Sequence, residues 1–226
     1  MTLDLARKAA AELLGTAFLV CAVVGSGIAA TRLSPGQVGL ELLENSLITG
    51  AALVALILTL QPVSAAFNPV VTLVEAILGS LRWADAAVLT IAQILGGTIG
   101  AVAANLMFHL DAVSISVHVR SAGNLWLGEV VATFGLILVV FGAIRSGRTQ
   151  TIAIAVGGYI TAAYWFTSST SFANPAVTVA RMFSDTFAGI APSSVPMFIV
   201  MQLIGAMLGC VTVRFLYPQL TESKVA

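Results

Sequence analysis

Charged residues are scarce in this chain of 226 residues, which has 10 Lys and Arg, 10 Asp and Glu, and a charged fraction of 9%. A soluble domain averages about 25% charged residues, so the composition argues against a soluble protein. The net charge of zero gives no electrostatic basis for binding nucleic acid. Hydrophobic residues make up 58%, and the mean hydropathy is +1.01. We therefore expect a membrane protein with several spans.

Cysteine and histidine are also rare, with two of each. Cys21 and Cys210 each lie in an apolar run and give no basis for a disulfide framework. His109 and His118 fall in one connection and are interpreted as solvated loop residues. The sequence has no metal-ligand spacing and no pairing of a nucleophile with a base. We therefore expect no metal, no cofactor and no catalytic residue.

Six apolar segments are long enough to cross a bilayer as helices, which takes about 20 residues each. The first follows Arg7 and Lys8, as the apolar part of a signal peptide would, but its length favours a membrane span. The fifth is short, and the polar loop after it is expected to extend the crossing. The six segments lie near 9–31, 44–63, 83–108, 125–144, 150–166 and 195–217.

Two shorter apolar segments, near 68–78 and 174–184, each begin with Asn-Pro after a polar loop. Asn at the N-cap followed by Pro in the first turn is a favourable start for a helix. Neither segment is long enough to cross, so each is predicted to be a half-helix that enters the membrane and stops. Irregular backbone survives in a membrane only where it lines a cavity or is buried in protein. The two segments therefore indicate a pore.

The chain repeats itself, because three landmarks recur in the same order. They are a Glu in an apolar span (Glu12 and Glu129), the Asn-Pro box, and a Gln followed by spaced glycines (Gln93 and Gln202). Each half holds three spans, an odd number, so the second copy is inverted in the membrane. Inverted repeats with broken helices place the functional site at the midplane. We expect one channel domain over 1–226, with repeats over about 1–110 and 124–226.

The distribution of Lys and Arg among the connections predicts the orientation. Three of them, Arg32, Arg120 and Arg181, lie on the side opposite the termini. The termini are therefore predicted to be cytoplasmic, in the inner membrane of a cell, with the second half-helix entering from outside. The other seven lie on the same side as the termini and are Arg7, Lys8, Arg82, Arg145, Arg148, Arg214 and Lys224.

The N-termini of the two half-helices meet near the bilayer centre in this arrangement, and their dipoles repel cations. Asn68 and Asn174 are expected to cap their own helices and to aim a side-chain N–H at the lumen. Backbone carbonyls of the preceding loops supply acceptors along the path. Such a path suits neutral solutes that form hydrogen bonds. The predicted carbonyl ladder comprises Ser64, Ala65, Ala66, Ser171 and Phe172.

Glu12 and Glu129 are carboxylates inside apolar spans, where an ionisable group is functional or tied to a partner. We interpret them as acceptors for backbone N–H groups of the two re-entrant loops. The alternative is a proton relay, which would make the protein a proton-coupled transporter. An intramembrane enzyme is the weakest hypothesis, because the sequence offers no catalytic set.

Taken together, these features resemble the aquaporin and aquaglyceroporin family, the major intrinsic proteins, over nearly the whole chain. The motifs that carry the resemblance are the doubled Asn-Pro box, Asn68-Pro69 and Asn174-Pro175, with the Glu of the first span and the Gln-x-x-Gly of the last. The resemblance implies an all-α membrane protein with six transmembrane helices, two re-entrant half-helices and an inverted repeat. It also implies a homotetramer in membrane lipid, with one passive pore per subunit and no cofactor.

The chain departs from the family at several positions. The first box ends in Val70, where the family usually has Ala, whereas the second ends in the usual Ala176. Ala66 replaces the common His two residues before the first Asn. Val177 stands where the family usually has a pore-lining Arg.

Counting from the two boxes, the positions that form the narrow filter in the family correspond here to Ile48, Ala162, Ser171 and Val177. Water-selective members have His plus Arg in this ring, and glycerol-conducting members pair the Arg with large aromatics. This ring has neither, so a wide, uncharged and mostly apolar filter is expected. Water, glycerol, urea and neutral metalloid hydroxides such as arsenite would pass.

Arg181 follows Val177 by four residues, so on a helix the two share a face about 6 Å apart along the axis. One interpretation places its charge in the outer vestibule, with its repeat counterpart Glu75 at the inner mouth. The other makes it an interfacial residue at a helix C-terminus, paired with Asp185. Both remain open from the sequence.

Overall fold

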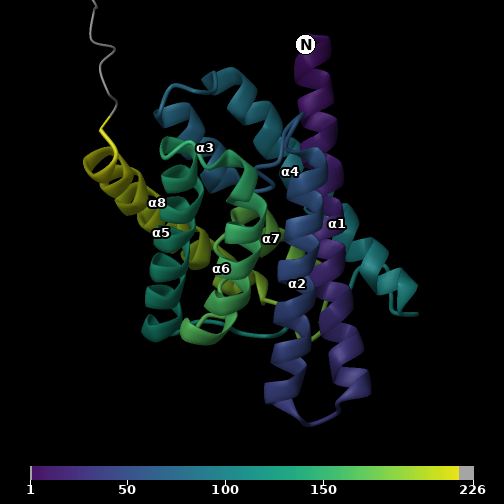
Figure 1. The fold of residues 1–226 in the computed structure, drawn as a ribbon. Helices are drawn as coiled ribbons and strands as arrows, with labels where there is room; N and C mark the ends of the chain where they lie inside the picture. The colour runs from purple at the N-terminus through teal and green to yellow at the C-terminus, as the bar shows by residue number, and fades with distance from the viewer. Residues whose placement is uncertain (1, 219–226) are drawn as a thin grey trace, which may run out of the picture.

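The computed structural model describes residues 2–218, which form helices and loops without a strand. Three 3-10 turns, η1 (Thr149–Thr151), η2 (Arg181–Phe183) and η3 (Pro192–Ser194), adjoin the helices. The helices (Figure 1) are α1 (Leu3–Leu33), α2 (Val38–Leu60), α3 (Pro69–Ile77), α4 (Trp83–Met107), α5 (Gly123–Arg145), α6 (Ile152–Phe166), α7 (Pro175–Ala180) and α8 (Val195–Leu216).

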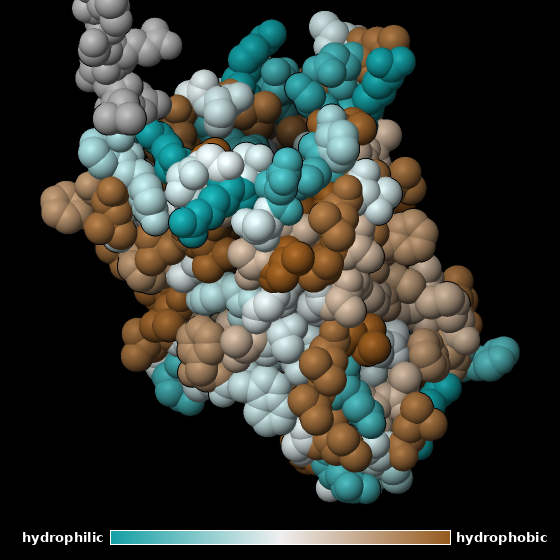
Figure 2. All heavy atoms as spheres, viewed as in Figure 1, coloured by the Kyte–Doolittle hydropathy of each residue, from teal (hydrophilic) through white to brown (hydrophobic). Residues whose placement is uncertain are grey.

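Five helices in the described part, α1, α2, α4, α5 and α8, are long and apolar enough to cross a membrane. The fifth predicted span is α6, which has 15 residues and is short, as expected. Figure 2 shows apolar side chains over the middle of the molecule and hydrophilic ones toward its two ends. The predicted all-α class, with helices long and apolar enough to cross a membrane, is confirmed.

The long helices pack in matched pairs, α1 with α4 in the first half of the chain and α5 with α8 in the second. Small residues allow the close approach within each pair. A Cβ on Gly96 or Gly100 of α4 would overlap the carbonyl oxygen of Leu13 or Ala17 of α1. Gly205 of α8 faces the Val130 carbonyl of α5 in the same way. Glycine at these positions brings the helix backbones into direct contact, as is common in membranes.

The two half-helices begin where the Asn-Pro boxes predict. The Asn68 side-chain oxygen accepts from the backbone N–H of Val70 at 3.1 Å, and α3 starts at the proline. The Asn174 oxygen accepts from Ala176 and Val177 at 3.0 and 3.2 Å, and α7 starts in the same way. The second half-helix is shorter than predicted as an α-helix, because it tightens into η2 after Ala180.

The N-terminal end of α1 and the C-terminal end of α8 lie toward the same end of the molecule, the upper one in Figure 1. This arrangement is expected when a chain crosses the membrane an even number of times. The loop between α1 and α2 lies at the opposite end.

The glycine contact between α1 and α4 generates a testable prediction. Gly100→Ala forces a methyl group against the α1 backbone, so we expect it to destabilise the fold by about 1–3 kcal/mol. Gly158→Ala in α6 is the matched control, because its Cβ would meet no atom within 4 Å. Thermal unfolding in detergent measures both variants. Equal stability of the two would show that the close contact is not needed.

Candidate solute pathway

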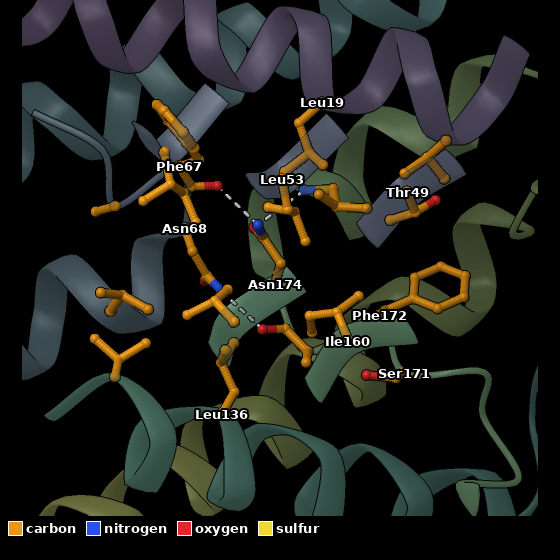
Figure 3. Close-up of a pocket in the computed structure, with 18 of the residues that line it drawn as sticks. Leu19, Thr49, Leu53, Phe67, Asn68, Leu136, Ile160, Ser171, Phe172 and Asn174 are labelled. Atoms are coloured by element: carbon orange, nitrogen blue, oxygen red, sulfur yellow. Dashed lines mark hydrogen bonds between the residues drawn. The ribbon is translucent and has the colours of Figure 1, made fainter. Parts of the chain in front are cut away.

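A cavity lies between the two half-helices and helices α1, α2, α5 and α6. Its interior offers about 80 Å³ to water-sized molecules. Asn68 and Asn174 contribute its central polar side chains (Figure 3). Lys8 and Glu75 line a second hollow, which shares Ala65, Ala66 and Val71 with the cavity. The apolar side chains that line the cavity include Leu19, Val23, Leu53, Leu136, Val140 and Ile160.

The two Asn side chains join the half-helices to each other. Asn68 Nδ2 donates to the carbonyl oxygen of Ala173 at 2.8 Å, and Asn174 Nδ2 donates to that of Phe67 at 2.7 Å (Figure 3). A side-chain amide has two N–H groups, so one on each Asn remains for a solute. The sequence predicted lumen-facing donors but not this reciprocal bond, which depends on the opposite loop.

Both loops have residues in the left-handed backbone region just before the box. Phe67 has φ 48° and Ala173 has φ 47°, while Ser171 has φ 50°. Non-glycine residues adopt this conformation at a cost of about 1–3 kcal/mol and keep it only when their surroundings hold it. The conformation turns the Phe67 and Ala173 carbonyls toward the opposite Asn.

Glu12 is the acceptor that holds the first loop. Its carboxylate accepts from the backbone N–H of Ala66 at 2.8 Å and of Phe67 at 2.7 Å, and also from the Ser64 hydroxyl. Gln93 Nε2 donates to the same carboxylate at 2.7 Å and to Thr72 Oγ1 at 2.8 Å. The fully buried carboxylate therefore has partners from the loop and from α4, and Gln93 connects it to Thr72 of α3.

Glu129 holds the second loop with matching backbone and glutamine contacts. Its carboxylate accepts from Phe172 and Ala173 N–H, each at 2.9 Å, and from Gln202 Nε2 at 2.6 Å. Gln202 also donates to Thr178 Oγ1 at 2.8 Å. Sequence reasoning used the two glutamines only as landmarks and missed Thr72 and Thr178. Their position four residues after each box Asn was an available signal.

The expected ring of four residues is only partly brought to the cavity. Ser171 and Val177 line it, whereas Ile48 is 49% exposed on the outer face of α2 and Ala162 is exposed on α6. This placement corrects the predictions for Ile48 and Ala162. A helix turns about 100° per residue, so an error of one or two positions points a side chain away from the cavity.

Thr49 and Tyr164 line the cavity in their place, each 3% exposed. Their hydroxyls form a hydrogen bond of 3.1 Å between α2 and α6. Large aromatics were expected to be absent here, and Tyr164 is therefore a second correction. Three hydroxyl side chains, those of Thr49, Tyr164 and Ser171, therefore line the cavity, rather than the one that was expected.

The residues of the predicted carbonyl ladder border the cavity or the hollow next to it. Ala65, Ala66, Ser171 and Phe172 line the cavity, and Ser64 lines the hollow with Glu75.

Arg181 lies at the cavity and is only 2% exposed. Its Nε donates to the Ala188 carbonyl, and its Cζ lies 3.4 Å from the centroid of the Phe172 ring. Asp185 instead accepts from the backbone N–H of Val117 at 3.0 Å, and residues 2–218 contain no ion pair between it and Arg181. The expected pairing with Asp185 is therefore wrong.

Comparison with known proteins identifies relatives over almost the whole chain. The family model "Major intrinsic protein" matches residues 1–151 and 145–226. The chain is 48% identical to "Aquaglyceroporin AqpS" of Rhizobium meliloti (strain 1021) over 94% of this chain and 91% of that protein. It is 28% identical to "Probable aquaporin NIP7-1" of Arabidopsis thaliana over 67% of this chain and 54% of that protein.

Among solved structures, the aquaglyceroporin from Plasmodium falciparum is similar with a TM-score of 0.70, covering 96% of both chains. The sequence identity is 20%, so this likeness concerns the fold, and it confirms the predicted aquaporin-like architecture.

The carboxylate contacts predict that each Glu is a structural support. Glu129→Gln removes a charged acceptor from two loop N–H groups, so we expect the free energy of unfolding to fall by about 2–3 kcal/mol. Asp4→Asn is the control, because its pair with Lys8 is exposed and contributes about 0–1 kcal/mol. Denaturation in detergent compares the two. A Glu129→Gln protein as stable as Asp4→Asn would contradict the supporting role.

Proposed function

Because the chain belongs to the major intrinsic protein family, we propose that it conducts water and small neutral solutes passively across a membrane. The observation that carries the proposal is the cavity between two half-helices whose Asn side chains are bonded to each other's loops. The half-helix dipoles disfavour cations there, and the free N–H groups and loop carbonyls replace the hydration of a neutral solute. The small solutes proposed to pass alongside water are glycerol, urea and neutral metalloid hydroxides such as arsenite.

The selectivity filter of this proposal is the ring of Thr49, Tyr164, Ser171 and Val177. All four line the cavity, and none is charged. Val177 occupies the place of the usual Arg, which leaves room for solutes larger than water. Arg181 places a positive charge one turn outward, and Glu75 places a carboxylate at the other mouth.

We further propose a single channel domain of two inverted repeats that assembles as a homotetramer in lipid, with no cofactor. The start of α1 and the end of α8 lie toward the same end of the molecule, which supports both termini being on one side of the membrane. The distribution of Lys and Arg assigns that side to the cytoplasm. The exposed apolar side chains Phe18, Leu47, Ile48, Trp165 and Val211 support contact with lipid or neighbouring subunits. The inner membrane of a cell is the proposed location.

The alternative, a proton-coupled transporter, requires Glu12 or Glu129 to exchange protons with the pathway. Both carboxylates are fully buried, and neither is among the side chains that line the cavity. Their oxygens already accept from loop N–H groups, which need a charged or strongly polar acceptor. These contacts favour the channel.

Flux measurements distinguish the two functions. Downhill glycerol flux into proteoliposomes should be the same with and without a pH gradient, because a passive pore moves no proton with its solute. Liposomes without protein provide the background. A flux that needs the gradient would establish the coupled transporter instead.

The filter assignment predicts the effect of restoring the usual residue. Val177→Arg fills space and adds a rigid set of donors, so flux of glycerol and urea should fall several-fold more than flux of water. Val177→Leu is the control for added volume without charge. Stopped-flow light scattering follows all three solutes. Unchanged ratios among the solutes in Val177→Arg would show that residue 177 is not in the narrow ring.

A further inference from the structure

The Arg181 guanidinium has hydrogen-bonding capacity that the protein leaves unused. The side chain is 2% exposed and lines the cavity, and only its Nε has an acceptor, the Ala188 carbonyl. Neither terminal nitrogen donates to any residue of the described chain, 2–218. A guanidinium has five N–H donors, so four remain for a ligand.

The charge of Arg181 is also not matched by a carboxylate in contact. Glu129 is occupied by the N–H groups of Phe172 and Ala173 and by Gln202. Asp185 accepts from Val117. Within residues 2–218, the ion pairs are those of Lys8 with Asp4 and of Arg82 with Asp85. A buried cation without a counter-ion attracts an anion from solution.

A second arginine shows by contrast what makes Arg181 available. The Cζ of Arg120 lies 5.1 Å from the centroid of the same Phe172 ring. However, Arg120 donates to the Gly189 carbonyl at 2.9 Å and to the Phe187 carbonyl at 3.3 Å, and it is not among the cavity-lining side chains. The two cations share one aromatic ring, but only Arg181 faces the pathway.

Ser171 offers a second donor in the same cavity. Its Oγ is buried without a hydrogen-bond partner in the described structure, and the side chain lines the cavity. Figure 3 shows Ser171 and Phe172 at the same end of the cavity as Thr49, away from Phe67 and Asn68. A buried hydroxyl without a partner is unfavourable, so a ligand oxygen there gains a hydrogen bond.

Most of the other side chains that line the cavity are apolar, among them Leu53, Ile160 and Val177. An ion that loses its water among such side chains is strongly disfavoured, because nothing there replaces its hydration. An anion held at Arg181 would therefore stay at the mouth.

We infer that Arg181 and Ser171 form a binding site for a small oxyanion of carboxylate type, and that an anion bound there obstructs neutral solutes. A planar guanidinium matches the two oxygens of a carboxylate. Phe172 and the Ala188 carbonyl hold the guanidinium in place. The inference rests on the proposed function, because obstruction is observed as slower flux of a neutral solute.

Formate, the smallest carboxylate, is the probe. Glycerol flux into proteoliposomes at neutral pH is measured in sodium formate and in sodium chloride of equal concentration. The ratio of the flux in formate to the flux in chloride is compared among the variants. For the parent chain, we expect formate to reduce flux saturably, by about half or more at saturation. Arg181→Met should lose this reduction, whereas the matched control Arg120→Met should keep it.

Ser171→Ala provides a second, milder test that leaves the arginine in place. Loss of one hydrogen bond should raise the half-inhibiting formate concentration about 2- to 10-fold. If Arg181→Met fails to assemble, Ser171→Ala decides alone, and an unchanged half-inhibiting concentration would overturn the inference.

Two further results separate this inference from the proposed function. Normal glycerol flux that formate leaves unchanged, or equal inhibition of Arg181→Met and the parent, would overturn the anion site and leave the channel intact. Absence of glycerol flux from a folded parent chain in chloride would instead overturn the proposed channel, and the obstruction inferred from it.

Discussion

The bond between a buried carboxylate and the backbone of a re-entrant loop is the constraint on which the rest of this structure depends. A loop inside a bilayer has N–H groups that cannot reach water, so each needs an acceptor within the protein. Glu12 and Glu129 supply two oxygens each, and Gln93 and Gln202 bond to the same carboxylates from α4 and α8. The paired left-handed residues Phe67 and Ala173 are held by these bonds. Without them, the N–H groups of Phe67 and Ala173 would have no acceptor within the described protein.

The Asn side chains then connect two loops that are each supported from their own half of the chain. Each Asn caps one half-helix and donates to the carbonyl that precedes the other. The Glu that supports one loop therefore also helps to fix the other loop, through the Asn side chain that connects the two loops. This coupling explains why the same residue types recur in both halves. A change in one support is transmitted to both walls of the cavity.

Sequence reasoning predicted the half-helices well, because Asn-Pro determines a helix start locally. It also predicted the loop role of Glu12 and Glu129, because a carboxylate in an apolar span needs nearby donors. It misplaced Ile48 and Ala162, since counting along the chain does not give the rotation of α2 or α6 about its axis. Thr49 and Tyr164 became identifiable only through their contact across 115 positions. The stacking of Arg181 on Phe172 was hidden for the same reason, because it depends on the path of a loop.

The placement of Arg181 separates two tasks that one residue combines in the family's usual filter. An arginine in the ring narrows the passage and also repels cations there. In this chain Val177 leaves the ring uncharged, while the cation lies one turn away and is held against Phe172 and Ala188. Width and charge therefore depend on different residues that line the same cavity. Under the proposed channel function, residue 177 would set which solutes fit through the cavity, and Arg181 would act on their charge and orientation.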